Sequence, residues 1–450
     1  MTTTLPNTTL PPPPRAFRWI VLVLISLAMF GNYYIYDCIS PLADVLAAQL
    51  KFSDSDIGLL QAIYSMPNVF MVLVGGFIID RLGTKRSTLI FAVLCLLGAA
   101  ITAAAEMGPL IASGQFIATL LPSSFGVVDP KLIVMAAGRL VFGLGAESLI
   151  VAVTTAIAKW FRGKELSFAF GVNLTIARIG SFAALNSPTW AKHFYESWQW
   201  PLLISVGAGV VCVAGAVIYW ILEDTATRKY EMGSANETDK VVWKELLNFG
   251  ASYWYIVALC ITFYSGIFPF QTFAVKFFMD AHGTTREFGG FLSSILTLFA
   301  MIATPLFGLM VDKIGKRSLF MMFGSLLLIP VYLIMAYTHI SLYVPMAMMG
   351  VAFSLIPAIM WPSVAYIVDQ SKLGTAYGLM TMIQNMGLTG FNILIGWAND
   401  TSAAGAANPG GYTLGMLIFS CLGFFGLLFA FLLRRSEMGP HAHGLETIKA

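Results

Sequence analysis

A short charged string occurs twice in the chain, each time at the end of a long apolar stretch. The first copy, Gly-Phe-Ile-Ile-Asp-Arg-Leu-Gly-Thr-Lys-Arg, occupies residues 76–86, and the second, Gly-Leu-Met-Val-Asp-Lys-Ile-Gly-Lys-Arg, occupies residues 308–317. Charged residues and glycines that follow two apolar helices in the same order indicate that a helical unit has been duplicated. We therefore expect two related halves, each containing several membrane-spanning helices.

The composition agrees with a membrane-embedded chain. Of the 450 residues, 58% are hydrophobic and 11% are charged, whereas about 25% are charged in ordinary soluble proteins. So many apolar side chains cannot be buried in one soluble core. The sequence contains no nucleotide-binding loop, no cluster of metal ligands and no Ser-His-Asp arrangement. We therefore expect no enzyme activity, no cofactor or metal site and no nucleic-acid partner.

Twelve apolar stretches are long enough to cross a bilayer, which takes about 20 residues of helix. They occupy residues 17–47, 55–79, 87–107, 131–158, 166–190, 201–222, 250–279, 287–311, 318–338, 341–368, 374–398 and 411–433. Glycines and prolines interrupt the apolar segment 108–130, where we expect a long loop with at most a short surface helix. The predicted fold is an all-α membrane protein with twelve transmembrane helices in two pseudo-symmetric six-helix halves.

The polar segments divide the chain into five parts. We expect a disordered tail at 1–16, a six-helix bundle at 17–222, a cytoplasmic linker at 223–249, a second six-helix bundle at 250–433 and a cytoplasmic tail at 434–450. Most Lys and Arg residues fall at the span ends on the side of both termini, and such an excess marks the cytoplasmic side. The opposite span ends carry Lys51, Lys131, Lys192, Lys276 and Arg286.

The duplicated string resembles a signature of the major facilitator superfamily, which carries it between helices 2 and 3 and again between helices 8 and 9. Residues 139–145, Arg-Leu-Val-Phe-Gly-Leu-Gly, are similar to that family's helix-4 signature. Further segments resemble the branch of lysosomal dipeptide transporters, among them 64–69, 145–149, 160–166, 177–181, 373–378 and 383–387. Residues 1–16 contain no acidic dileucine sorting signal, so we expect a prokaryotic or plasma-membrane relative and not a lysosomal one, with the cell (inner) membrane as the expected location.

Glu147 and Arg178 lie at one predicted depth, on the fourth and fifth helices. Each is twelve residues from the cytoplasmic end of its helix, which places it about 18 Å from that surface, near the centre of the bilayer. An arginine fork suits a carboxylate and a glutamate suits an ammonium group, so the pair could hold both ends of a zwitterion. A structural salt bridge is the alternative. The resemblance favours substrate binding, because the dipeptide-transporting branch has its substrate-contacting acid and base in these motifs.

Asp37 and Arg139 form a second pair, predicted near the outer mouth on helices 1 and 4. They could form an outer gate, provide a proton site beside the route, or simply hold two helices together. Lys276, near the outer end of the seventh predicted helix, could extend to the lipid interface or take part in the same gate.

Polar and aromatic residues at middle and outer depths could complete a binding site, although helix packing would equally explain any one of the aromatic side chains. The predicted substrate-binding set comprises Asn68, Tyr64, Tyr264, Gln271, Trp361 and Asn385, and Gln384 lies at a similar depth. We expect the charged contacts in the first half and a neutral hydrogen-bonding wall in the second half.

The resemblance also implies a conformational latch at the duplicated string. In that family the aspartate faces the start of a helix from the other half, where the helix dipole favours an anion. Here Asp80 would face the chain near Gly374 when the outer side is open. The predicted latch residues are Asp80, Arg81, Gly83, Arg86, Asp312, Lys313 and Gly374.

The sequence therefore predicts a monomeric transporter that moves a small zwitterion, in the first place a dipeptide, by alternating access and uniport. One alternative is a proton-coupled symporter of organic anions or other small metabolites. Another is a membrane sensor that binds a ligand without moving it. An accessory subunit is left open.

Overall fold

The computed structural model describes residues 11, 13–122, 128–161, 165–230, 249–369, 372–440 and 442–447, and these residues form helices and connecting loops without a β-strand. The first half consists of α1 (Arg15–Asp37), η1 (Ser40–Leu42), α2 (Ala43–Leu50), α3 (Asp54–Ala103), α4 (Gly108–Leu120), α5 (Pro130–Phe161), α6 (Leu166–Leu185), α7 (Ser187–Trp190), η3 (Lys192–Glu196) and α8 (Gln199–Lys229). The second half consists of α9 (Ala251–His282), α10 (Arg286–Ile314), α11 (Arg317–Tyr337), α12 (Tyr343–Ile367), α13 (Leu373–Thr401), η6 (Pro409–Tyr412) and α14 (Thr413–Glu437).

The helix α3 contains two spans, because its backbone breaks at Gly83. Gly83 has φ 77° and ψ 165°, a conformation that is essentially restricted to glycine. With α3 counted twice, the described part of the chain contains twelve long helices, as predicted. Ten stretches meet a simple criterion of length and hydropathy for crossing a membrane. The first span of α3 and the helix α13 are not among the ten, and in α13 the Asn, Gln and Thr residues lower the hydropathy.

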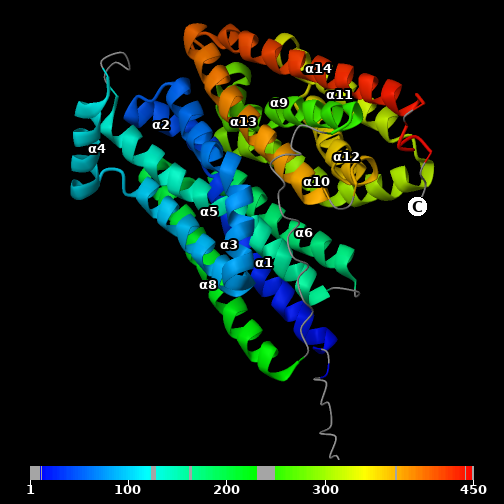
Figure 1. Ribbon diagram of the computed structural model, residues 1–450. Helices are drawn as coiled ribbons and strands as arrows, with labels where there is room; N and C mark the ends of the chain where they lie inside the picture. The colour runs from blue at the N-terminus through cyan, green and yellow to red at the C-terminus, as the bar shows by residue number, and fades with distance from the viewer. Residues whose placement is uncertain are drawn as a thin grey trace, which may run out of the picture.

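The two halves form a V in Figure 1, with the first half, coloured from blue to green, on one arm and the second half, coloured from the green of α9 to red, on the other. They meet where α3 contacts α13 and α6 contacts α10. We call the side on which α1 ends and α3 begins the closed side. The terminal side is the one on which α1 begins and α14 ends, and there the arms diverge (Figure 1).

Two glycines let the halves contact each other at backbone distance on the closed side. A Cβ atom on Gly58 of α3 would collide with the carbonyl of Asn392 on α13, and one on Gly396 of α13 would collide with the carbonyl of Asp54. Any larger residue at either position would hold the two bundles apart.

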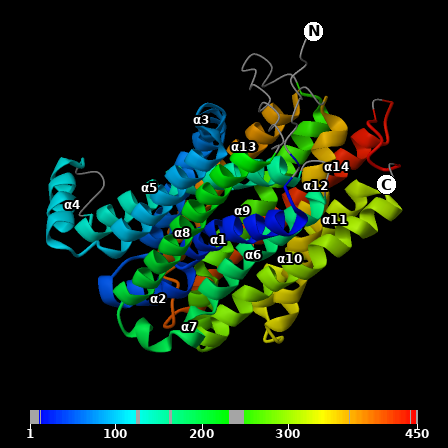
Figure 2. The same cartoon turned by 90° about the horizontal axis from the view of Figure 1, so that it is seen from below.

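Several boundaries differ from the predicted ones. The first apolar stretch runs from Arg15 to Leu50, close to the predicted 17–47, but it is not one continuous helix. The helix α1 ends at Asp37, because Pro41 follows and lacks the N–H that a continuing helix needs. The predicted surface helix is α4, which contacts α5 and stands at the edge of the first bundle (Figure 2). The helix α8 extends to Lys229, into the predicted linker. Residues 231–248 of that linker and most of the N-terminal tail lie outside the described residues.

Candidate functional site

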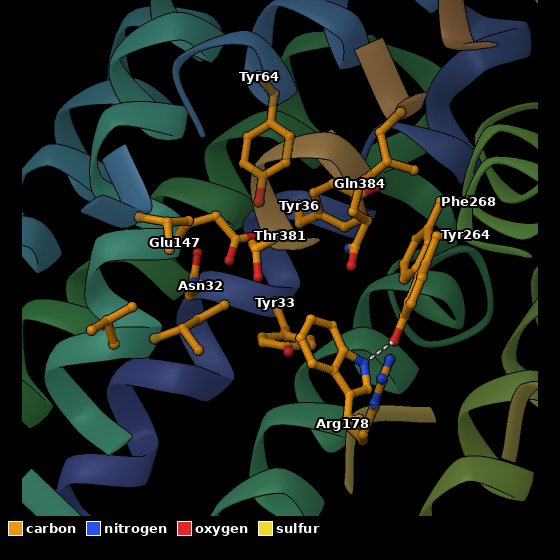
Figure 3. Close-up of a pocket in the computed structure, with 15 residues that line it drawn as sticks. Asn32, Tyr33, Tyr36, Tyr64, Glu147, Arg178, Tyr264, Phe268, Thr381 and Gln384 are labelled. Carbon is orange, nitrogen blue, oxygen red and sulfur yellow. Dashed lines mark hydrogen bonds between the residues drawn. The ribbon is translucent and has the colours of Figure 1, made fainter. Parts of the chain in front are cut away.

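A cavity of about 320 Å³ lies between the two halves, and Figure 3 shows the residues around it. Helices α1, α3, α5 and α6 of the first half and α9, α12 and α13 of the second half all contribute to its wall. Its lining residues are Asn32, Tyr33, Tyr36, Tyr64, Val72, Glu147, Ile150, Val151, Arg178, Tyr264, Phe268, Trp361, Thr381, Gln384 and Leu388. The volume falls in the range of about 300–1,000 Å³ that is typical of small-molecule sites.

Glu147 and Arg178 are the two acidic or basic side chains among these lining residues. Both are half-buried, and they lie on different sides of the cavity in Figure 3. Among the described residues, neither side chain takes part in a salt bridge. The structure therefore presents an anion and a cation across a shared space, not a pair that neutralises itself.

Arg178 is held by aromatic rings. Its guanidinium carbon lies 5.6 Å from the ring centroid of Tyr33 and 5.0 Å from that of Phe353. Its Nε atom is buried without a hydrogen-bond partner in the described structure. Two rings within about 6 Å of a guanidinium stabilise its charge through cation–π contacts and do not use its N–H groups as hydrogen-bond donors.

A row of aromatic side chains lines the cavity from one half of the protein to the other. Trp361 donates its indole N–H to the hydroxyl of Tyr264 at 3.0 Å, the interaction dashed in Figure 3. Tyr264 stacks on Phe268 with centroids 5.7 Å apart, and Phe268 and Tyr36 meet edge to face with centroids 6.1 Å apart. Tyr36 in turn lies 4.9 Å from Tyr64. The rings give the site an apolar surface with hydroxyl groups at intervals.

The structure places five of the predicted substrate-binding residues around this cavity. They are Glu147, Arg178, Tyr64, Tyr264 and Trp361.

The other three predicted residues lie elsewhere. Asn68 is fully buried, and both polar atoms of its amide lack a partner in the described structure. Asn385 donates to the carbonyl of Thr381, one turn earlier in its own helix, at 3.0 Å. Gln271 is buried near the closed side, where its backbone carbonyl accepts a hydrogen bond from Ser40.

Helix phase explains most of the residues that the sequence reasoning missed. Thr381, Gln384 and Leu388 line the cavity from α13, and their spacing of three and four residues is that of one helical face. Polar residues on that face would have favoured Gln384 over Asn385. Asn32, Tyr33 and Tyr36 similarly share a face of α1, and that periodicity would have identified them.

Arg139 and Asp37 are not joined in an ion pair in the described structure. Arg139 is 2% exposed. It donates to the carbonyl of Ile35 on α1 at 3.0 Å and also to the side-chain oxygen of Gln61 on α3. These contacts lie within the first half, so Arg139 ties α5 to its neighbours. They favour the packing alternative for Arg139 over a gate between the halves.

Lys276 joins the two halves and does not extend to the lipid interface. It forms an ion pair with Asp54 at the start of α3. Asn399 of α13 donates to the same carboxylate at 2.8 Å. The carboxylate of Asp400 accepts the backbone N–H groups of Asp54 and Ser55 at 2.9 and 2.8 Å, where the dipole of α3 favours an anion. The second half therefore holds the N-terminus of α3 from three positions.

Two further ion pairs cross the closed side. Arg286 of α10 pairs with Asp44 of α2, with Nε 3.1 Å from a carboxylate oxygen. Lys192 of η3 pairs with Glu287 of α10 at 2.7 Å. Together with the Lys276 contact they form what we call the closed-side clasp, defined by Asp54–Lys276, Asp44–Arg286 and Lys192–Glu287.

The predicted latch residues lie on the terminal side, where the halves diverge. Asp80 is exposed at the end of the first span of α3, and Gly374 lies at the start of α13. Arg81 covers the ring of Phe77 at 4.3 Å. Asp312 forms a salt bridge with Arg317 of its own half at 2.7 Å.

Lys313 and Arg86 are exposed on the same side. The latch is predicted to close when the halves meet on the terminal side, and in this structure they diverge there. The latch therefore stays a prediction.

Two six-helix bundles with a cavity between them, divergent on one side and clasped at the other, are an arrangement typical of helical membrane transporters. The chain belongs to the major facilitator superfamily, whose sequence profile matches residues 25–277 and 270–447. This confirms the predicted family and fold class. It also identifies the chain as a transporter and not an enzyme.

The chain resembles a group of curated relatives over most of its length. It is 31% identical to the lysosomal dipeptide transporter MFSD1 of Bos taurus over 87% of this chain and 81% of the relative. It is 30% identical to the Homo sapiens protein of the same name over 87% of this chain and 82% of the relative. The predicted branch resemblance is therefore confirmed.

A solved structure shares the fold. A bacterial homologue of the human lysosomal transporter Spinster, in an inward-facing and occupied conformation, aligns with a TM-score of 0.67 at 16% identity, covering 94% of this chain and 98% of that chain.

Proposed function

We propose that this protein transports small zwitterionic solutes, in the first place dipeptides, by uniport. The observation that carries the proposal is the separation of Glu147 and Arg178 across one cavity, without a salt bridge to neutralise either in the described structure. A peptide offers an ammonium group for the glutamate and a carboxylate for the arginine fork. The names of the relatives at 30–31% identity support the same substrate class.

The cavity also suits variable side chains between the two charged ends. Its wall between Glu147 and Arg178 consists largely of rings and aliphatic groups, with Gln384 and Thr381 as neutral hydrogen-bonding groups. Apolar surface tolerates many side chains, whereas the charges select the common termini of the peptide backbone. We therefore infer broad side-chain specificity.

The distribution of Lys and Arg supports cytoplasmic termini. The expected place in the cell (inner) membrane depends instead on the missing dileucine signal in residues 1–16. With that orientation, the terminal side faces the cytoplasm and the structure corresponds to an inward-open state. The closed-side clasp would then be the outer gate, and transport would require it to open while the terminal side closes.

The test is exchange transport by the purified protein in liposomes. We expect radiolabelled alanyl-alanine to enter liposomes preloaded with unlabelled alanyl-alanine. Glu147→Gln and Arg178→Ala should each reduce exchange at least about 30-fold, because truncating one partner of a desolvated charge contact costs 2–5 kcal/mol. Thr175→Ala is the matched control, because Thr175 is exposed on α6 and bonds its own helix at Gly171.

Normal exchange by a folded Glu147→Gln or Arg178→Ala variant would contradict the proposal. Binding without exchange in the wild-type protein would favour the sensor alternative.

Proton-coupled symport is the second candidate, and the position of Glu147 in the cavity favours it. This half-buried carboxyl has no cationic partner among the described side chains, and ionisable groups in such positions mark proton relays. An imposed pH gradient separates the candidates. Uptake against a substrate gradient under an inward proton gradient would support symport, and indifference to the gradient would support uniport.

A further inference from the structure

One of the two aromatic rings beside Arg178 comes from the opposite half of the protein. Arg178 and Tyr33 belong to α6 and α1, whereas Phe353 belongs to α12. Phe353 is 3% exposed and is not among the residues that line the cavity. It packs against Phe263, which does not line the cavity, and against Phe268, which does, with ring centroids at 6.5 and 5.9 Å. A substrate in the cavity would therefore meet Arg178 before it met Phe353.

No hydrogen bond or ion pair orients the guanidinium of Arg178 in the described structure, and its buried Nε has no partner. The two rings, at 5.6 and 5.0 Å from the guanidinium carbon, are its observed supports. A long side chain with free rotation would lose entropy when a ligand fixed it. Two rings packed against the planar group restrict that rotation before the ligand arrives.

We propose that Phe353 is a positioning residue for the Arg178 subsite. By adding an aromatic surface from the second half, it fixes the plane of the guanidinium with the N–H edge toward the cavity. This subsite is then complete only while α12 stands beside α6, as it does with the closed side clasped. The inference rests on the proposed function, in which Arg178 binds the carboxylate of the substrate.

Variants at Phe353 can distinguish a positioning role from a packing role. Phe353→Leu keeps an apolar side chain in the core but removes the ring quadrupole that attracts a cation. Phe353→Tyr keeps the ring. Phe263 provides the matched control, because it is buried, packs against Phe353 and makes no cation–π contact with Arg178.

The experiment compares two probes that differ only at the carboxylate, alanyl-alanine and its C-terminal amide. Apparent Kd values are measured by thermal-shift titration of the purified full-length protein. Phe353→Leu should weaken binding of alanyl-alanine about 5- to 30-fold, and it should change binding of the amide by less than about twofold. Phe353→Tyr should retain affinity for both probes. Phe263→Leu should affect the two probes equally.

Equal losses for both probes in Phe353→Leu would overturn the proposal, as would a carboxylate-selective loss in Phe263→Leu. Phe353→Met provides a second non-aromatic variant if the leucine variant does not fold. A wild-type protein that binds neither probe would contradict the proposed function itself, and the inference would fall with it. A wild-type protein that binds alanyl-alanine while Phe353→Leu loses no selectivity would refute the positioning role alone.

Discussion

Removing the carboxylate of Asp54 should open the closed side. In the clasp, the side chains of Asp54 and Lys276 are 1% and 13% exposed, so the ion pair is almost fully desolvated. Breaking a buried pair by neutralising one partner costs about 3–5 kcal/mol, because the other charge stays buried alone. Asp54→Asn should therefore shift the equilibrium away from the closed arrangement by at least roughly 150-fold.

The assay is the distance between spin labels at one exposed position of each half on the closed side, measured in nanodiscs without substrate. Wild type should give mainly the short distance of the clasped state, and Asp54→Asn should populate a longer one. Lys192→Gln is the matched control on the same face, because Lys192 is 73% exposed and such pairs contribute about 0–1 kcal/mol. The double variant Asp54→Asn/Lys276→Gln should recover part of the short population, since it leaves no buried charge unpaired.

The reasoning fails if Asp54→Asn leaves the distance distribution unchanged, or if Lys192→Gln shifts it as far. It also fails if the double variant opens the closed side further than Asp54→Asn alone. That result would show that the equilibrium is controlled by hydrogen bonds from the asparagine amide at position 54, and not by the unpaired charge of Lys276.

Two further predictions concern the terminal side. Gly83→Ala should lower the midpoint of thermal unfolding, because alanine at φ 77° and ψ 165° costs about 1–3 kcal/mol. The control Gly76→Ala should not lower it, because Gly76 is helical and nothing lies within 4 Å of the added Cβ. Equal midpoints for the two variants would contradict this account of the turn. Asp80→Asn should slow the maximal exchange rate more than it raises the substrate concentration for half-maximal exchange, as a latch between halves requires, and a change in affinity alone would exclude the latch.

The membrane-embedded class, the duplication and the helical spans were predictable from the chain, because they depend on runs of apolar residues and on local turn chemistry. Gly83 is an example, since the turn needs a backbone conformation that glycine alone adopts readily. The end of the helix α1 within the first apolar stretch was not predictable from hydropathy, because η1 and α2 are also apolar and Pro41 determines the break.

The sequence could predict how far along its helix each candidate residue lies, but only partly which side of the helix faces the cavity. Counting residues from a helix end gives a depth, and Glu147 and Arg178 both line the cavity as the count suggested. Which neighbour of a pair faces inward depends on helix rotation by about 100° per residue. Gln384 lines the cavity and Asn385 bonds within its own helix for this reason.

The amino-acid sequence by itself determined a duplicated helical membrane transporter with one acid and one base near mid-membrane, because hydropathy and charge are local properties of the chain. Only the tertiary structure decided which charges pair. Lys276 meets Asp54 across the two halves, while Arg139 bonds Ile35 and Gln61 within one half. These partners are more than 70 residues apart in the sequence. Their contacts depend on how the helices pack within a bundle and on how the two bundles dock, which no local pattern encodes.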